Sequence, residues 1–121
     1  PDAIRDVVAS ALDRCDIDYA LTLSTGAELV MPSAASDRVT YVLVPQGNTI
    51  QDCMMSVEAK AVDEGGNIAL LSTGNRSPFQ FTQAIDGRCV ASDIQLYLDL
   101  FDWPRRGKEQ AARVREERIG F

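Results

Sequence analysis

Glu58 and Lys60 have the most catalytic-looking spacing in the chain, because they are two positions apart in a segment whose apolar positions alternate. This alternation predicts a strand over residues 55–62, with both side chains on one face. With an upstream acid, Asp37 or Asp52, the pattern could hold a divalent metal and activate water, as in metal-dependent nucleases. An exposed edge strand also carries alternating charges, and lysine there discourages pairing with other chains. We interpret Glu58 and Lys60 as solvated strand residues, with a nuclease-like domain, active or inactive, as the alternative.

Asp99 and Asp102 form a second acidic pair, three residues apart on one face of an expected helix. Two carboxylates at this spacing could act as a pair or bind a hard metal ion. Such a pair is more often the solvated edge of a helix, and we interpret it in that way. If the chain doubles back after Pro104, Arg105 and Arg106 come within reach of Asp99 as structural ion-pair partners.

Composition excludes several catalytic classes. The chain has no histidine, which removes Ser-His-Asp and Cys-His nucleophiles and the usual acid–base group near neutral pH. Its three cysteines, Cys15, Cys53 and Cys89, are widely spaced and include no Cys-x-x-Cys pair. This arrangement predicts buried free thiols in a reducing cytosol. We predict no catalytic residue, no metal and no cofactor, and therefore a protein that is not an enzyme.

Length and charge narrow the class further. The 121 residues are enough for one domain, and no apolar run is long enough to cross a bilayer, which predicts a cytoplasmic protein without membrane contact. The chain starts at Pro1 rather than methionine, which indicates a piece of a longer protein. Residues 1–104 contain 15 acids and 6 bases, whereas residues 105–121 contain 3 acids and 6 bases. The body should repel nucleic acid, and only the tail could attract it.

The densest apolar run predicts a helix between Ser92 and Pro104. Ser92 and Gln95 have the spacing of a capping box, and proline stops the helix. Gln95, Asp99 and Asp102 share one narrow wedge of this helix, and apolar residues occupy the rest. We therefore expect burial around most of its circumference, within its own domain or partly against another chain.

The other segments predict a mixed sheet with helices before, within and after it. A first helix is expected over residues 2–15, and a second one is capped by Ser24 or Thr25 and runs to Met31. One or two helical turns are expected over 49–54, and a solvated helix is expected over 107–118. Expected strands cover 19–22, 38–44 as the central strand, 55–62 and 68–71 as a hairpin, and 88–91 after a turn at Asp86-Gly87. Residues 72–78 should be loop, and the state of 79–85 stays open. The predicted fold class is α/β (α+β), a single domain over 1–121 that ends in two consecutive helices.

One signature resembles a known family. The run Val90-Ala-Ser-Asp-Ile-Gln-Leu-Tyr-Leu-Asp-Leu100, followed by Trp103-Pro-Arg-Arg-Gly107, is similar to the carboxy-terminal signature of the type IV abortive-infection antitoxins, the AbiEi class of bacterial transcriptional regulators. Segments 19–22, 39–44 and 65–71 fall in the order associated with that family. Asp93 stands where the family has proline, and Arg105 stands where a small residue is common.

The resemblance implies a toxin–antitoxin role. Members of the family read DNA through an amino-terminal winged helix-turn-helix, and nothing before Tyr19 can form one. The chain would then be the carboxy-terminal part of a longer regulator, contacting DNA only through that missing domain. Its implied partner is a cognate nucleotidyltransferase-like toxin, with a homodimer as a further option, and a plain dimerisation domain is the third reading. The contact residues that we predict are Asp99, Asp102, Trp103, Arg105 and Arg106.

Overall fold

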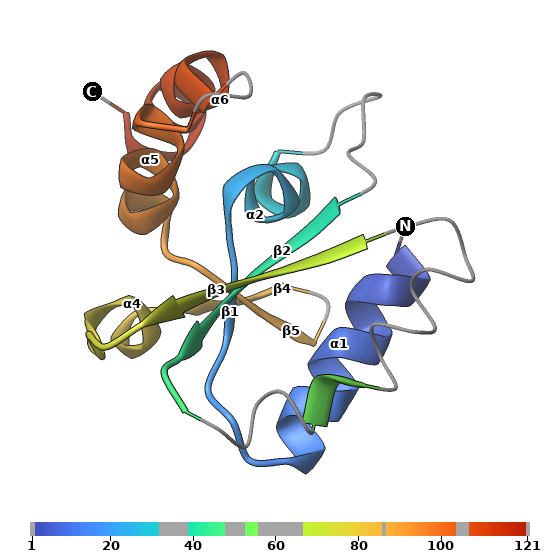
Figure 1. Ribbon diagram of the computed structural model, residues 1–121. Helices are drawn as coiled ribbons and strands as arrows, with labels where there is room; N and C mark the ends of the chain where they lie inside the picture. The colour runs from blue at the N-terminus through green and yellow to red at the C-terminus, as the bar shows by residue number, and fades with distance from the viewer. Residues whose placement is uncertain are drawn as a thin grey trace.

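The computed structural model describes residues 2–31, 39–47, 53–55, 67–85, 87–103 and 107–120. Within them the helices are α1 (Asp2–Arg14), α2 (Leu23–Val30), α4 (Ser77–Gln80), α5 (Asp93–Phe101) and α6 (Gly107–Val114), and a π-helical segment, η1 (Arg115–Ile119), continues α6. The strands are β1 (Ala20–Leu21), β2 (Val39–Pro45), β3 (Asn67–Thr73), β4 (Gln83–Ile85) and β5 (Arg88–Val90). The elements form one α+β domain with a mixed sheet, which confirms the predicted fold class (Figure 1).

The described strands form a sheet in the order β3-β2-β1-β5-β4. β2 and β3 run parallel along their whole lengths, from the pair Val39–Asn67 to the pair Pro45–Thr73. β1 is antiparallel to β2 and parallel to β5, and β4 and β5 form an antiparallel hairpin. β2, the expected central strand, is interior, but the middle position belongs to the fully buried two-residue β1.

α2 begins directly after β1, without a loop. The N–H of Thr22 donates to the carbonyl of Tyr41 at 3.2 Å, and the next residue, Leu23, has a positive φ of 52°. Thr25 lies inside the helix, where its Oγ1 accepts from the N–H of Tyr41 at 2.9 Å. The predicted cap at Ser24 or Thr25 is wrong, because the backbone switches from strand to helix at Thr22, which is the N-cap residue.

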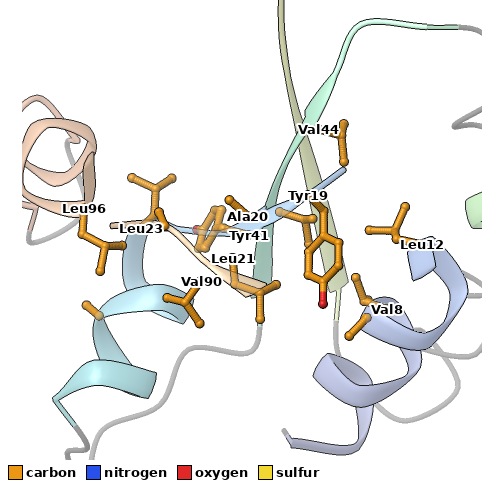
Figure 2. Packing of buried hydrophobic residues seen from close by; sticks show 14 of the residues in the cluster. Val8, Leu12, Tyr19, Ala20, Leu21, Leu23, Tyr41, Val44, Val90 and Leu96 are labelled. Carbon is orange, nitrogen blue, oxygen red and sulfur yellow. The ribbon is translucent and has the colours of Figure 1, made fainter. Parts of the chain in front are cut away.

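α1 and the pair α5–α6 lie on opposite sides of the strands, with α2 between β2 and that pair (Figure 1). The predicted helix over 2–15 is confirmed, and its apolar face is buried as expected. Figure 2 shows Val8 and Leu12, both fully buried, beside the ring of Tyr19. Leu96 of α5 lies at the other end of the same core.

Two buried arginines tie α1 to its neighbours. Arg5 Nη2 is 2.9 Å from Glu28 Oε2, and Arg88 Nη2 is 2.7 Å from Asp6 Oδ1. The two guanidinium side chains are only 5% and 8% exposed. Since a buried charge is costly without a partner, these pairs fix where α1 lies on the sheet.

The cysteines differ from the prediction of free thiols. Cys15, just after α1, and Cys53, in a helical turn over residues 53–55, form a disulfide with Cα atoms 6.6 Å apart. Cys89 is free and half-buried. Residues that are 38 positions apart in sequence offered no local signal for the pairing. The prediction of a reducing compartment rested on three free thiols, and the disulfide removes that ground.

The segment between β3 and β5 is more ordered than predicted. β3 continues to Thr73, and α4 occupies part of the predicted loop over 72–78. The open question at 79–85 is answered by the end of α4 and by β4. Gly87, with a φ of 78°, turns the chain from β4 to β5, as predicted for Asp86-Gly87. The predicted hairpin partner over 55–62 falls outside the described residues beyond Met55, which is helical.

Candidate functional site

α5 starts as the capping pattern predicts. Ser92 Oγ accepts from the N–H of Gln95 at 3.1 Å. The other half of the predicted box is different, since Gln95 Nε2 donates to Asp99 Oδ1 at 2.7 Å. The helix ends at Phe101, and Asp102 is its C-cap.

The Asp99 carboxylate faces α2 instead of solvent. Thr22 Oγ1 donates to Asp99 Oδ2 at 2.6 Å, and Gln95 occupies the other oxygen. Thr22 is 1% exposed and makes no side-chain cap for α2, so its hydroxyl is available as a donor. Hydrogen bonds to an ionised acceptor are short and strong. The interpretation of Asp99 as a solvated edge is therefore wrong, because this contact ties its carboxylate to α2, whereas Asp102 of the same wedge is exposed.

Three large apolar side chains lie on the outside of α5. Ile94, Leu98 and Phe101, called here the α5 stripe, are 62%, 56% and 46% exposed. Leu96 and Leu100, on the opposite face, are fully buried. The described neighbours of α5 cover only its inner side, so burial of nearly the whole circumference within its own domain is not found, and the alternative of burial partly against another chain stays a prediction. The stripe residues are four and three positions apart, which places them on one face.

Glycines explain how closely α2 and α6 cover that inner side. A Cβ on Gly26 would lie 2.5 Å from the Leu96 side chain and 2.8 Å from the carbonyl oxygen of Leu21. A Cβ on Gly107, at the start of α6, would overlap the carbonyl of Leu100. Both helices can therefore approach α5 at van der Waals distance, and they leave the stripe uncovered.

A cavity of about 580 Å³ opens at the Ile94 end of the α5 stripe. Its walls come from α4 and the residue that follows it, from the first turn of α5, and from η1; they include Pro78, Phe81, Ile94 and Ile119. Phe81 is 77% exposed, so the cavity adds an aromatic surface to the stripe. The volume is in the range of small-ligand pockets, about 300–1,000 Å³.

A small polar cluster lies at the rim of this cavity. Arg118 Nε is 3.2 Å from Asp93 Oδ1, and Arg118 Nη2 donates to Gln83 Oε1 at 3.2 Å. Gln83 Nε2 also donates to Asp93 Oδ1, at 2.9 Å. These bonds join η1, β4 and the start of α5. The acid and the base neutralise one another, so this end of the stripe carries no excess charge.

The other end of the stripe contains two of the predicted contact residues. Trp103 is half-buried, and its ring meets the Tyr41 ring at 5.4 Å and 78°, an edge-to-face contact that stabilises the core. Asp102 is exposed. Lys108 Nζ lies 5.8 Å from the centroid of the Phe101 ring, a cation–π contact that places a positive charge at this end.

The remaining predicted residues cannot be placed. Arg105, Arg106, Glu58, Lys60, Asp37 and Asp52 lie outside the described residues. Across the parts of the chain that are described, no group of three or more Cys, Asp or Glu side chains is arranged to hold a metal ion. No helix in those parts is long and apolar enough to cross a membrane.

Sequence reasoning selected one end of this surface and missed its centre and its other end. Asp102 and Trp103 were chosen for charge and for position after the helix, whereas Leu98 and Phe101 were assigned to the core. Their spacing of three and four residues was a usable signal, but apolar residues on the opposite face have the same spacing. Phe81 and Arg118 reach the site only through tertiary structure, so no local pattern could have found them.

The Asp93 and Asp99 carboxylates are occupied by hydroxyl, amide and guanidinium donors, Asp102 is exposed, and the rest of the accessible surface is largely apolar. Such a surface is suited to contact with another macromolecule. Comparisons of the chain with protein-family models, with curated proteins and with solved structures each find no match.

Proposed function

We propose that this chain is a non-catalytic protein-interaction module of a bacterial antitoxin-like transcriptional regulator. It acts through the α5 stripe, by binding the cognate nucleotidyltransferase-like toxin or by assembling the regulator. DNA would be read by an amino-terminal domain outside this chain. The resemblance of residues 90–107 to the AbiEi signature supports the class, and the exposed stripe supports the mode of action.

The exposure of Ile94, Leu98 and Phe101 is the observation that carries this proposal. Contiguous exposed apolar side chains mark interaction sites when polar residues surround them. Here Asp93 and Arg118 lie at one end, and Asp102 and Lys108 lie at or near the other. Central apolar and aromatic residues surrounded by a polar rim are typical of protein interfaces.

The predicted contact residues take different roles in this proposal. Asp102 lies at the rim and is available to a partner. Asp99 and Trp103 position α5, through Thr22 and Tyr41 respectively. Arg105 and Arg106 remain predicted contacts in the connection between α5 and α6.

The test uses the intact regulator and the toxin encoded by the neighbouring gene. Leu98→Asp and Phe101→Asp should each weaken either toxin co-purification or regulator self-association by at least about 30-fold, the effect of losing an interface hot spot. Met55→Asp is the matched control, because Met55 is 71% exposed but lies in the turn that is joined to the end of α1 by the disulfide.

Charge reversal at Arg105 and Arg106 tests these two predicted contacts separately, by toxin co-purification and by regulator self-association. The proposal is abandoned if both stripe variants retain wild-type toxin binding and wild-type self-association while remaining folded by circular dichroism.

A further inference from the structure

We infer that the α5 stripe pairs with the stripe of a second copy of this chain, with the two α5 helices antiparallel about a two-fold axis near Leu98. The inference rests on the proposed function and deepens it by naming the partner. The cognate toxin then becomes an alternative occupant, which the experiment below distinguishes.

The spacing of the stripe fits a helix pair. Ile94, Leu98 and Phe101 follow one another at four and three residues, the repeat of the apolar seam between two packed helices. Over these two turns, about 10 Å of helix, the seam is symmetric about its middle residue to within one position. A two-fold axis there makes Leu98 face Leu98 of the second copy, and Ile94 face Phe101 of the second copy.

The cavity lies where the antiparallel arrangement would bring the Phe101 ring of the second copy. It is bordered by Ile94, so the Phe101 ring of the second copy arrives at its mouth. Phe81, 77% exposed, provides an aromatic wall there, and edge-to-face or offset ring contacts stabilise such pairs. The same chain thus carries both the projecting ring, Phe101, and the hollow that receives it. Self-complementarity of this kind is what a two-fold interface requires.

The charges favour the antiparallel orientation over the parallel one. Lys108 lies against Phe101 at one end of the stripe, and the Asp93–Arg118 pair lies at the other end. In a parallel pair the two Lys108 side chains would face each other, which is unfavourable. In the antiparallel pair each Lys108 instead approaches the Asp93–Arg118 end, where the acid and the base neutralise one another, so the repulsion between the two lysines is absent.

The expected affinity is modest. The paired surface consists of the three stripe residues, Phe81 and the rim, so it belongs to the small class of specific interfaces. We expect a dissociation constant on the order of micromolar, measured by sedimentation equilibrium of the chain alone. Leu98→Asp should weaken this association by at least about 30-fold, because two carboxylates would face each other at the axis.

Cysteine cross-linking tests the register. In a Cys89→Ala background, Leu98→Cys should form a disulfide-linked dimer on mild oxidation, since the two side chains meet at the axis. Ile94→Cys and Phe101→Cys should each cross-link poorly alone but efficiently when the two proteins are mixed. Met55→Cys, exposed and remote from the stripe, should show only the background level of collisional cross-linking.

Each result decides one point. A chain that stays monomeric through the micromolar range overturns the inference, and stripe-dependent toxin binding in that case leaves the proposed function standing. Cross-linking of Ile94→Cys and of Phe101→Cys each with itself, without linking in the mixture, overturns the antiparallel register. Dimerisation that is unchanged by Leu98→Asp places the contact elsewhere and overturns the inference, whereas toxin binding by the same variant decides the proposed function separately.

Discussion

α1 and α5 both bury leucine side chains against the domain, but they differ in where their remaining polar and apolar residues lie. α1 buries its apolar face, including Val8 and Leu12, and leaves Asp13 exposed. α5 keeps a carboxylate, Asp99, against the domain and exposes Leu98. The difference indicates that the face of a helix that turns inward depends on the neighbouring groups with which it packs.

The groups against which the two helices pack are different. α1 meets apolar side chains and Tyr19 on the sheet. α5 meets the hydroxyl of Thr22, which makes no cap for α2, and it packs closely against α2 at Gly26 and against α6 at Gly107. A buried donor needs an acceptor, so α5 satisfies Thr22 with Asp99 and its surplus apolar residues go outside.

The largest expected effect is a matched pair of leucine substitutions. Leu12→Ala on α1 should lower the free energy of unfolding by about 2–5 kcal/mol, because it leaves a cavity in the core. Leu98→Ala on α5 should change it by no more than about 0.5 kcal/mol, because Leu98 is an exposed residue. Urea unfolding at a concentration where the chain is monomeric measures both. Equal losses in the two variants would erase the contrast between the helices.

A smaller effect is expected at the Thr22–Asp99 contact. Thr22→Val keeps the side-chain shape but removes the donor, so the half-buried carboxylate loses one of its two side-chain partners. We expect a loss of about 1.5–3 kcal/mol, the range for hydrogen bonds to charged groups. Thr82→Val controls for the exchange of threonine for valine. No change in the urea midpoint would show that Asp99 does not anchor α5.

The smallest effect is a pH dependence on the α1 side of the core. Burial raises the pKa of Tyr19 from 10.0 to about 12, although the N–H of Cys89 donates to its hydroxyl at 3.1 Å and opposes this shift. The folded state therefore holds the proton more tightly than the unfolded state. Its stabilising contribution is complete below pH 10 and is lost as the pH rises towards 12.

By pH 11 the loss attributable to Tyr19 should be about 1.4 kcal/mol, which denaturant melts between pH 9 and about 11 can resolve. Tyr19→Phe should remove this part of the pH dependence, whereas Leu98→Ala should retain it. A profile that is identical in Tyr19→Phe and the wild type would contradict the raised pKa.

Much of the fold could be predicted because its signals are local. The helix over residues 2–14, the long strand over 39–45, the turn at Gly87 and the Ser92 start of α5 all follow from spacing or capping within a few residues. α2 was misplaced by two residues because its start depends on pairing of Thr22 with β2. The parallel register of β2 and β3 has no local signal, since it joins segments that are distant in sequence.

The candidate site was predictable in location but not in orientation. The α5 region was identified, and Asp102 is exposed as expected. Asp99 was assigned to solvent and Leu98 to the core, and both assignments were wrong for the same reason. A rotation of the helix by about 100°, the angle between adjacent residues, exchanges the environments of Leu98 and Asp99, and neither propensity nor periodicity measures that rotation.

The amino-acid sequence by itself determined most of the helices and strands, where α5 begins, and that a mixed sheet with flanking helices would form. Local hydrogen bonding and side-chain periodicity are properties of neighbouring residues, so they are readable there. Only the tertiary structure decided which face of α5 is turned inward, that Cys15 meets Cys53, and that Phe81, Ile94 and Arg118 enclose one cavity. Those outcomes depend on contacts between residues far apart in the chain, and it is such contacts that leave the α5 stripe exposed.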